Sequence, residues 1–278
     1  MELLRWMLKL LDTRMTTPVM YGPFHLVFFA LSIAFAVFLY KTKRDADEHF
    51  VRRLLLYTSL VVVFLEVLKQ INYTFSYDGP SIVADYQWYA FPFQFCSTPM
   101  YAGLAAAFLK KGKTHDAICA YLATYAVFGG LVVMIYPPQV FIDVAVINFQ
   151  TMICHGLMIT VGLYLLSVEY VALRHKTILS ATAVFCVFLL IAIGSNELVH
   201  ISGIAGDEAF NMFYISPHVA PSLPVYSTVQ EMVPYPYCLF IYVFIFALAA
   251  YVILLCAMLF RRVWVRVAHK DAVAENHN

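Results

Sequence analysis

Residues 237–260 read YCLFIYVFIFALAAYVILLCAMLF and carry no charged side chain. An α-helix needs about 20 mostly apolar residues to cross roughly 30 Å of hydrocarbon, and this stretch meets that requirement. Further apolar segments of similar character precede it at 24–40, 54–71, 92–109, 117–136, 149–168 and 178–199. The pattern predicts an all-α membrane protein, a bundle of about seven transmembrane helices.

The composition of the whole chain agrees with this fold class. Of 278 residues, 62% are apolar and 13% are charged, and the mean hydropathy is +0.77, whereas roughly a quarter of the residues of soluble domains are charged. A formal net charge of +1 without a dense basic block excludes nucleic acid as a partner. We expect a multi-pass protein of the cell membrane whose partners are membrane lipids, with no room for a sizeable soluble domain.

Three segments follow from the same pattern. Residues 1–22 begin with MELLRWMLKLLDTR, in which apolar and charged positions alternate at helical spacing, and this predicts a surface amphipathic segment. Residues 23–262 form a single polytopic membrane domain, and 263–278 form a tail. The 201–236 loop is long and rich in Pro, Tyr and Ser, which is typical of loops that fold over a site.

The distribution of Lys and Arg orients the chain. Lys, Arg or both follow the first, third, fifth and seventh predicted spans, while the other loops between spans carry Asp and Glu and no Lys or Arg. The positive-inside rule places the basic loops, and with them the C-terminus, in the cytosol. An odd number of spans then puts the N-terminus outside, against the preference of Arg5, Lys9 and Arg14.

Costly polar side chains lie near the outer ends of the predicted spans. Ionisable groups inside a membrane are candidates for function because they are expensive to place there. The sequence therefore predicts an outer-side intramembrane polar pocket formed by His25, Glu66, Lys69, Gln70, Gln94, Gln150, Asn196, His200 and Asn211.

Two helix faces in this set have a structural interpretation as well. Glu66, Lys69 and Gln70 are three and four residues apart, so they share a face and can form an ion pair that ties helices together. Asn196 and His200 also share a face, where hydrogen bonding between helices is an equally simple role.

The six cysteines fall inside or at the edges of the predicted spans, which argues against a disulfide framework in the loops. Packing is the expected role of Cys119, Cys186 and Cys256. Cys96 and Cys154 are better candidates for chemistry, because they lie at the depth of the polar pocket.

Metal and cofactor sites have little support. No CxxC or HExxH spacing occurs, so we expect no metal site and no cofactor. A three-histidine site made of His25, His155 and His200 is a minor alternative.

Five short motifs, in order, carry a resemblance to a known family. They are EVLKQI at 66–71, FPFQFCS at 91–97, GGL at 129–131 ahead of YP at 136–137, HGL at 155–157 followed by LYL at 163–165, and NMF at 211–213 ahead of PY at 234–235. Over about residues 57–241 the chain resembles the YwaF and transmembrane protein 164 family. The resemblance implies a multi-span membrane protein, and its bacterial branch implies a bacterial plasma membrane.

The animal member of that family is regarded as a cysteine-dependent acyltransferase acting on lysophospholipids, with a histidine assisting. His155 matches the family histidine, and Cys96 matches a cysteine typical of the bacterial branch. The animal enzyme has its cysteine directly after the proline, where this chain has Phe93, and the next family histidine is Gln94 here. The resemblance therefore implies either that Cys96 takes the role one turn deeper or that the reaction differs.

Two classes of function follow. In the first, Cys96 attacks an acyl ester, His155 acts as general base and acid, and Lys69 or Asn196 stabilises the oxyanion of a membrane-bound phospholipid acyltransferase or hydrolase. In the second, the same residues form a solute- or proton-coupled transport path. A non-catalytic lipid-binding protein is a third alternative.

Overall fold

The computed structural model describes residues 2–78, 81–137, 140–220 and 224–275 of a chain that is almost entirely helical. Within these residues, six helices are long and apolar enough to cross a membrane. They are α2 (Pro23–Lys43), α3 (Glu48–Thr74), the continuous segment Lys113–Ile135, α7 (Ala145–Ser167), α8 (Thr177–Ser202) and α10 (Tyr235–Glu275). The predicted all-α membrane bundle is confirmed.

The third of the seven predicted spans differs from expectation. Only α4 (Thr98–Phe108) is α-helical in the predicted 92–109 segment, and its 11 residues extend about 16 Å, half of the hydrocarbon thickness. Gln94 is extended, with a φ of −73° and a ψ of 163°. Pro92 restricts the backbone before this point, and Pro99 lies in the first turn of α4, where its missing N–H costs nothing. The predicted third span is therefore an extended and 3-10 stretch followed by an α-helix about half as long as the hydrocarbon is thick.

Short elements connect α3 to α4 at one end of the bundle. The antiparallel hairpin of β1 (Phe75–Asp78) and β2 (Ser81–Ala84) follows α3 directly, with Phe75 opposite Ala84. The 3-10 turns η1 (Trp88–Ala90) and η2 (Phe95–Ser97) then lead into α4. Irregular backbone inside a membrane is tolerated only where protein or a cavity surrounds it. We therefore expect η2 to be enclosed by neighbouring helices or to line a cavity.

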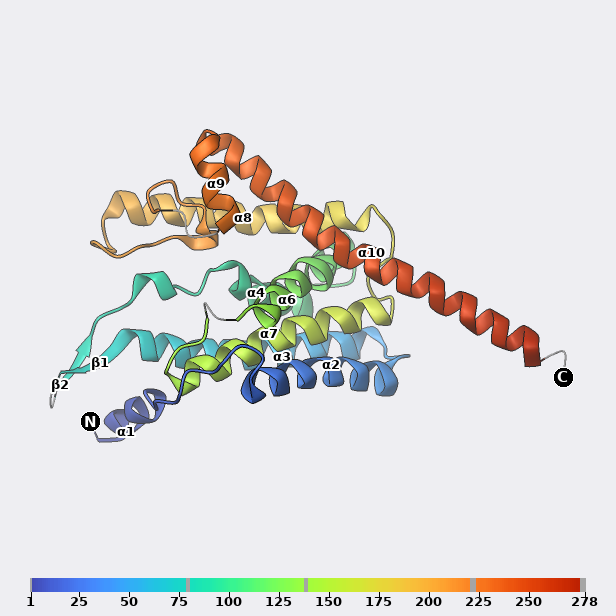
Figure 1. Ribbon diagram of the computed structural model, residues 1–278, viewed down its shortest axis with the longest axis horizontal. Helices are drawn as coiled ribbons and strands as arrows, with labels where there is room; N and C mark the ends of the chain where they lie inside the picture. Colours follow the sequence, from blue (N-terminus) through green and yellow to red (C-terminus); the bar gives the residue numbers. More distant parts are fainter. Residues whose placement is uncertain (1, 79–80, 138–139, 221–223, 276–278) are drawn as a thin grey trace.

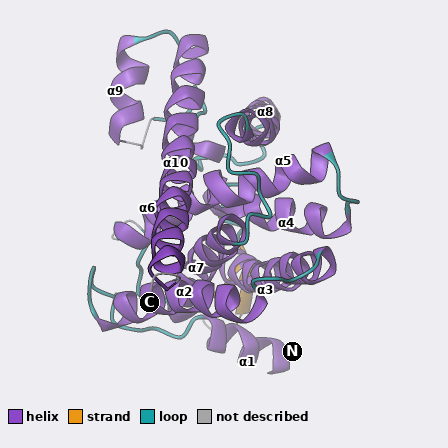
Figure 2. Ribbon diagram, turned by 90° about the vertical axis from the view of Figure 1, so that its right-hand side faces the viewer, coloured by secondary structure: helices purple, strands orange, loops and turns teal. Residues whose placement is uncertain are grey.

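The segment Lys113–Ile135 comprises α5 (Lys113–Tyr121), a π-helical turn η3 (Leu122–Ala126) and α6 (Val127–Ile135). It packs closely against α7, because a Cβ on Gly162 would lie 2.7 Å from the carbonyl oxygen of Leu122. Such π-turns often occur near functional sites. Figure 2 shows α7 between α2, α3 and α6, at the centre of the bundle.

The N-terminal helix α1 (Glu2–Leu11) lies against the end of the bundle that carries the β-hairpin (Figure 1). Its Leu8 and Leu11 are buried while Trp6 is exposed, as in an amphipathic helix. The chain after it is fixed by Arg14, which donates to the Asp143 carboxylate at 2.9 Å and pairs with Val144. The N-terminus thus lies at the end predicted to be extracytoplasmic.

The C-terminal part closes the other side of the molecule. After α8 come the 3-10 turn η4 (Met212–Tyr214), α9 (Pro224–Met232) and α10. Helix α10 crosses the bundle obliquely, and the two chain ends lie at opposite ends of the molecule (Figure 1). Because α10 continues without a break past residue 262, the domain boundary expected there stays a prediction.

Candidate functional site

Glu66 on α3 is the centre of a buried polar network. Its Oε1 accepts hydrogen bonds from Lys69 Nζ and from Gln70 Nε2, both at 2.8 Å, and its Oε2 accepts one from Gln150 Nε2 at 3.1 Å. The side chain of Glu66 is only 8% exposed. Each donor compensates a carboxylate that would otherwise be very costly to bury. The network joins α3 to α7.

Tyr86 extends this network towards the surface. Its hydroxyl donates to Gln70 Oε1 at 2.8 Å, and Gln70 Nε2 also donates to the carbonyl oxygen of Ala90 at 2.8 Å. Burial, with a smaller contribution from the charge of Glu66, raises the pKa of Tyr86 to about 12. The neutral phenol therefore remains a donor well above neutral pH.

A second group of predicted polar residues holds the segment 211–216 in place. Gln94 Nε2 donates to the Asn211 carbonyl at 2.9 Å, and Gln94 Oε1 accepts from Phe213 N at 2.9 Å. Asn196 binds both backbone groups of Met212, donating at 3.1 Å and accepting at 2.8 Å. Phe213 has a φ of 60°, an unusual value for a non-glycine residue, and these bonds fix it. Gln94 and Asn196 thus bind the loop backbone, as does Asn211, whose Oδ1 accepts from Ser216 N at 2.8 Å. Asn196 also lines a cavity beside the 203–210 loop.

His155 on α7 differs from these satisfied groups. The ring is buried, with 6% of the residue exposed, and Nδ1 lies 2.7 Å from the carbonyl oxygen of Thr151. A carbonyl only accepts, so Nδ1 carries the proton and Nε2 presents its lone pair. Nε2 has no hydrogen-bond partner among the described residues. A buried basic nitrogen without a protein partner is uncommon, and it marks His155 as a candidate for chemistry.

Two consecutive glycines of α6 bring the Cys96 turn and the His155 turn to the same place. A Cβ on Gly129 would lie 2.7 Å from Phe95 Cε1, next to Cys96, and one on Gly130 would lie 2.8 Å from the carbonyl oxygen of His155. Cys96 itself lies in η2, immediately before α4. The unpaired N–H groups at this end of a helix carry partial positive charge, which favours an anion nearby.

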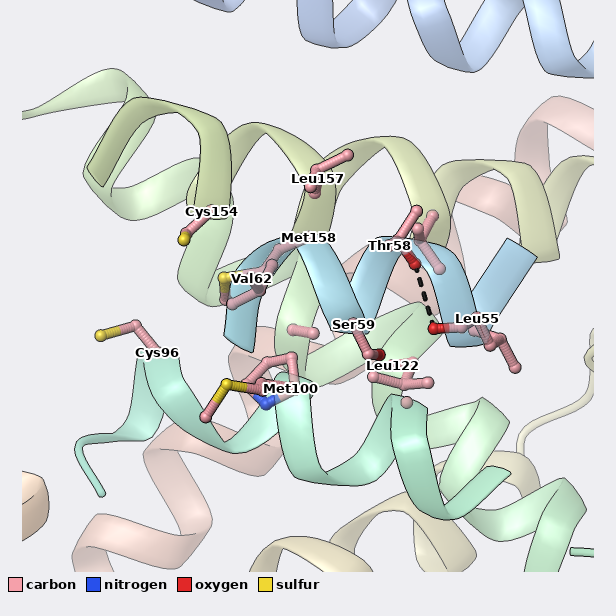
Figure 3. Close-up of a pocket in the computed structure, with 14 residues that line it drawn as sticks. Leu55, Thr58, Ser59, Val62, Cys96, Met100, Leu122, Cys154, Leu157 and Met158 are labelled. Carbon is pink, nitrogen blue, oxygen red and sulfur yellow. Dashed lines mark hydrogen bonds between the residues drawn. The ribbon is translucent and has the colours of Figure 1, made fainter. Parts of the chain in front are cut away.

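Cys96 and Cys154 line one cavity, of about 40 Å³, between α3, α4 and α7. Figure 3 shows both sulfurs at the same end of it, with Leu55 at the other end. Lys69 lies close enough to interact electrostatically with both thiols and with His155. The cavity has room for about three water molecules, and most of the other residues that line it are apolar.

The structure separates two predicted residues from this group. His25 accepts from Tyr21 N at 2.9 Å and lies 2.7 Å from the Met134 carbonyl oxygen, so both ring nitrogens are satisfied away from the Glu66 network. His200 stacks on His218 with 3.5 Å between ring centroids. It lines a separate cavity of about 370 Å³ beside the 203–210 loop.

The minor alternative of a three-histidine metal site is therefore wrong. His25 and His155 already use ring nitrogens on backbone groups. Across the described ranges, no group of three or more His, Cys, Asp or Glu side chains could hold a metal ion.

Other polar contacts were not predicted from the sequence. His218 Nε2 lies 3.1 Å from both carboxylate oxygens of Glu197. The Sγ of Cys119 lies 3.8 Å from both ring nitrogens of buried His115. Equal distances place this sulfur over the ring and not along a nitrogen lone pair, so this pair is a packing contact. The only sign of the Cys119–His115 contact in the sequence is that the two residues are four positions apart, which places them on one helix face.

Cys256 departs from the packing role expected of it. The residue is exposed on α10 and lines a large groove, whereas Cys119 is buried as predicted.

Together, the six long apolar helices and the buried polar centre define a multi-pass α-helical membrane protein. Comparison with family models finds a match to the TMEM164 family over residues 20–259. The chain belongs to the TMEM164 family, as its five motifs indicated. No curated protein and no solved structure matches the chain.

Proposed function

We propose that this protein is a membrane-embedded lipid acyltransferase in which Cys96 is the nucleophile and His155 the general base. The observation that carries the proposal is the buried His155 ring, whose Nδ1 is bound to Thr151 and whose Nε2 lone pair is unpartnered among the described residues. A general base needs a fixed tautomer and a free lone pair, and His155 has both. Cys154, which precedes it on α7, lines the cavity that Cys96 also lines.

The proposed reaction proceeds in two halves. Cys96 Sγ attacks the ester carbonyl of a donor phospholipid while His155 Nε2 takes the thiol proton, and the departing lysophospholipid alkoxide receives that proton. In the second half, His155 deprotonates the hydroxyl of an acceptor lysophospholipid, which attacks the thioester and releases Cys96, and the proton returns to its sulfur. Water in place of the acceptor would give hydrolysis.

Lys69 is the better candidate for oxyanion stabilisation. Asn196 uses both of its amide atoms on Met212, whereas the ammonium of Lys69 has three N–H donors and one ion-pair partner among the described residues, Glu66. The cavity is too small for an acyl ester as it stands, so the lipid has to displace a side chain. Met100, which lines it, is unbranched and rearranges readily.

A transport function receives less support. The described cavity beneath the Glu66 network is about 40 Å³ and is bordered by side chains such as Leu55, Val62 and Leu157, so a polar route across the bundle has no counterpart there. We therefore argue only for the enzymatic function. The host membrane is proposed to be a bacterial plasma membrane on the resemblance of Cys96 alone.

The test is acyl exchange by purified protein, given phospholipid with a labelled acyl chain and an unlabelled lysophospholipid. We expect His155→Gln to lower turnover by about 100- to 10,000-fold, and Cys96→Ser to lower it at least as much. Cys154→Ser distinguishes the second thiol of the cavity, and Cys186→Ser on α8 is the matched control. A labelled thioester on Cys96 should be detected by mass spectrometry. Turnover that persists in both the Cys96 and the His155 variant would exclude this mechanism.

A further inference from the structure

A groove of about 770 Å³ lies in the half of the bundle that is predicted to face the cytosol. Its walls are α2 and α10, and its floor is formed by α6 and α7. Figure 1 shows the middle of α10 crossing towards the C-terminal end of α2. Cys96, His155 and the Glu66 network do not line this groove, so it is separate from the candidate site.

The groove has the depth of one lipid leaflet. Its lining extends on α2 from Ile33 to Arg44 and on α10 from Ile253 to Trp264, each about 16 Å at 1.5 Å per residue. One leaflet contributes about 15 Å of hydrocarbon, half of the total. The volume lies within the range of roughly 300 to 1,000 Å³ found for ligand pockets. An acyl chain from the adjacent leaflet matches these dimensions.

The lining changes from apolar to charged along its length. Side chains such as Val37, Leu131, Leu163 and Ala257 form the inner part. The end of the groove that is predicted to face the cytosol carries two cations and two anions. They are Arg44, Arg261, Asp45 and Glu169. Arg261 forms an ion pair with Glu169.

Arg44 and Asp45 differ from that pair. Neither forms an ion pair with any other residue in the described part of the chain, and they are adjacent in sequence. The mouth of the groove thus offers a cation and an anion side by side.

We propose that this groove binds a zwitterionic glycerophospholipid, with one acyl chain between α2 and α10, its phosphate on Arg44 and its positively charged nitrogen next to Asp45. Guanidinium binds phosphate through paired hydrogen bonds, which makes Arg44 the main polar contact. An anionic headgroup would leave Asp45 facing a like charge, and a fatty acid would leave it without a partner. The site holds a lipid apart from the proposed reaction and does not depend on it.

The experiment measures bound lipid on the full chain. Protein purified from membranes in mild detergent is examined by native mass spectrometry, and delipidated protein is then titrated with dioleoylphosphatidylcholine, dioleoylphosphatidylglycerol or oleate. We expect one retained phospholipid and a thermal shift with phosphatidylcholine that exceeds the shift with the other two probes. Arg44→Ala should weaken binding about tenfold, while Arg44→Lys retains most of it.

Ala257→Phe fills the groove and should abolish the bound lipid. Arg53→Ala and Ala30→Phe, at exposed positions that do not line the groove, are the matched controls and should bind as the wild type does. If Ala257→Phe does not fold, the two Arg44 variants still test the site. Equal lipid binding by the Arg44→Ala variant and the controls, or a preference for phosphatidylglycerol or oleate, would overturn the proposal.

Discussion

Helices α7 and α10 are both apolar enough to span a membrane, yet they face opposite environments. In the most apolar window of each, 78% of α7 is buried and 11% of α10, while the mean hydropathy is 1.5 for α7 and 2.8 for α10. The helix that lipid surrounds is thus the more hydrophobic one. The buried helix carries Gln150, Thr151 and His155, because only protein neighbours can satisfy such groups in a bilayer. Function is therefore to be sought in the less hydrophobic centre.

The largest effect expected from this contrast concerns two glutamates. Glu66→Ala removes the acceptor of three donors and leaves Lys69, whose side chain is 17% exposed, as an uncompensated and largely buried charge, which should cost about 3 kcal/mol. Glu197→Ala, on peripheral α8 with a side chain 40% exposed, should cost less than about 1 kcal/mol. Denaturant unfolding in micelles measures the free energy of unfolding of both variants. Similar losses would show that the buried centre and the peripheral helix α8 do not differ in this respect.

Two glycines give the next effect. A Cβ on Gly162 of α7 would meet the Leu122 carbonyl at 2.7 Å, so Gly162→Ala should cost about 1–3 kcal/mol. A Cβ on Gly194 of α8 meets no atom within 4 Å, and Gly194→Ala should be neutral or stabilise by up to about 1 kcal/mol through helix propensity. Melting temperatures of the two variants compare them directly. A stabilised Gly162 variant would show that α7 is less tightly packed than described.

The smallest effect concerns Tyr86 and pH. The folded protein raises the pKa of Tyr86 to about 12, mainly through burial, while the unfolded value is about 10. The contribution of this group to stability is therefore complete below pH 10 and is lost as pH rises towards 12. We expect the melting temperature to fall over this range, and to fall less in Tyr86→Phe.

Tyr57→Phe, on the exposed face of α3, is the matched control for that measurement. Its pH profile should follow the wild type. If the melting temperature of Tyr86→Phe depends on pH as it does in the wild type and in Tyr57→Phe, Tyr86 does not contribute to the Glu66 network in the way described.

Hydropathy and spacing predicted the helices and the shared face of Glu66, Lys69 and Gln70, because both depend on residues near in sequence. The helix predicted from residue 92 was wrong before Thr98, since Gln94 is held extended by Asn211 and Phe213, more than 100 positions away. The same limit applies to His200, whose ring stacks on His218 in a distant loop. Whether Cys96 and His155 react stays a prediction.

The length of α10 has a mechanical consequence. Its 41 residues extend about 61 Å, twice the hydrocarbon thickness, and the helix passes beside the groove before leaving the bundle. An unbroken helix is stiff, so a displacement of its end near Glu275 would also move the segment around Cys256 and Ala257. The wall of the groove and the part of α10 that runs beyond the groove therefore belong to one continuous rod.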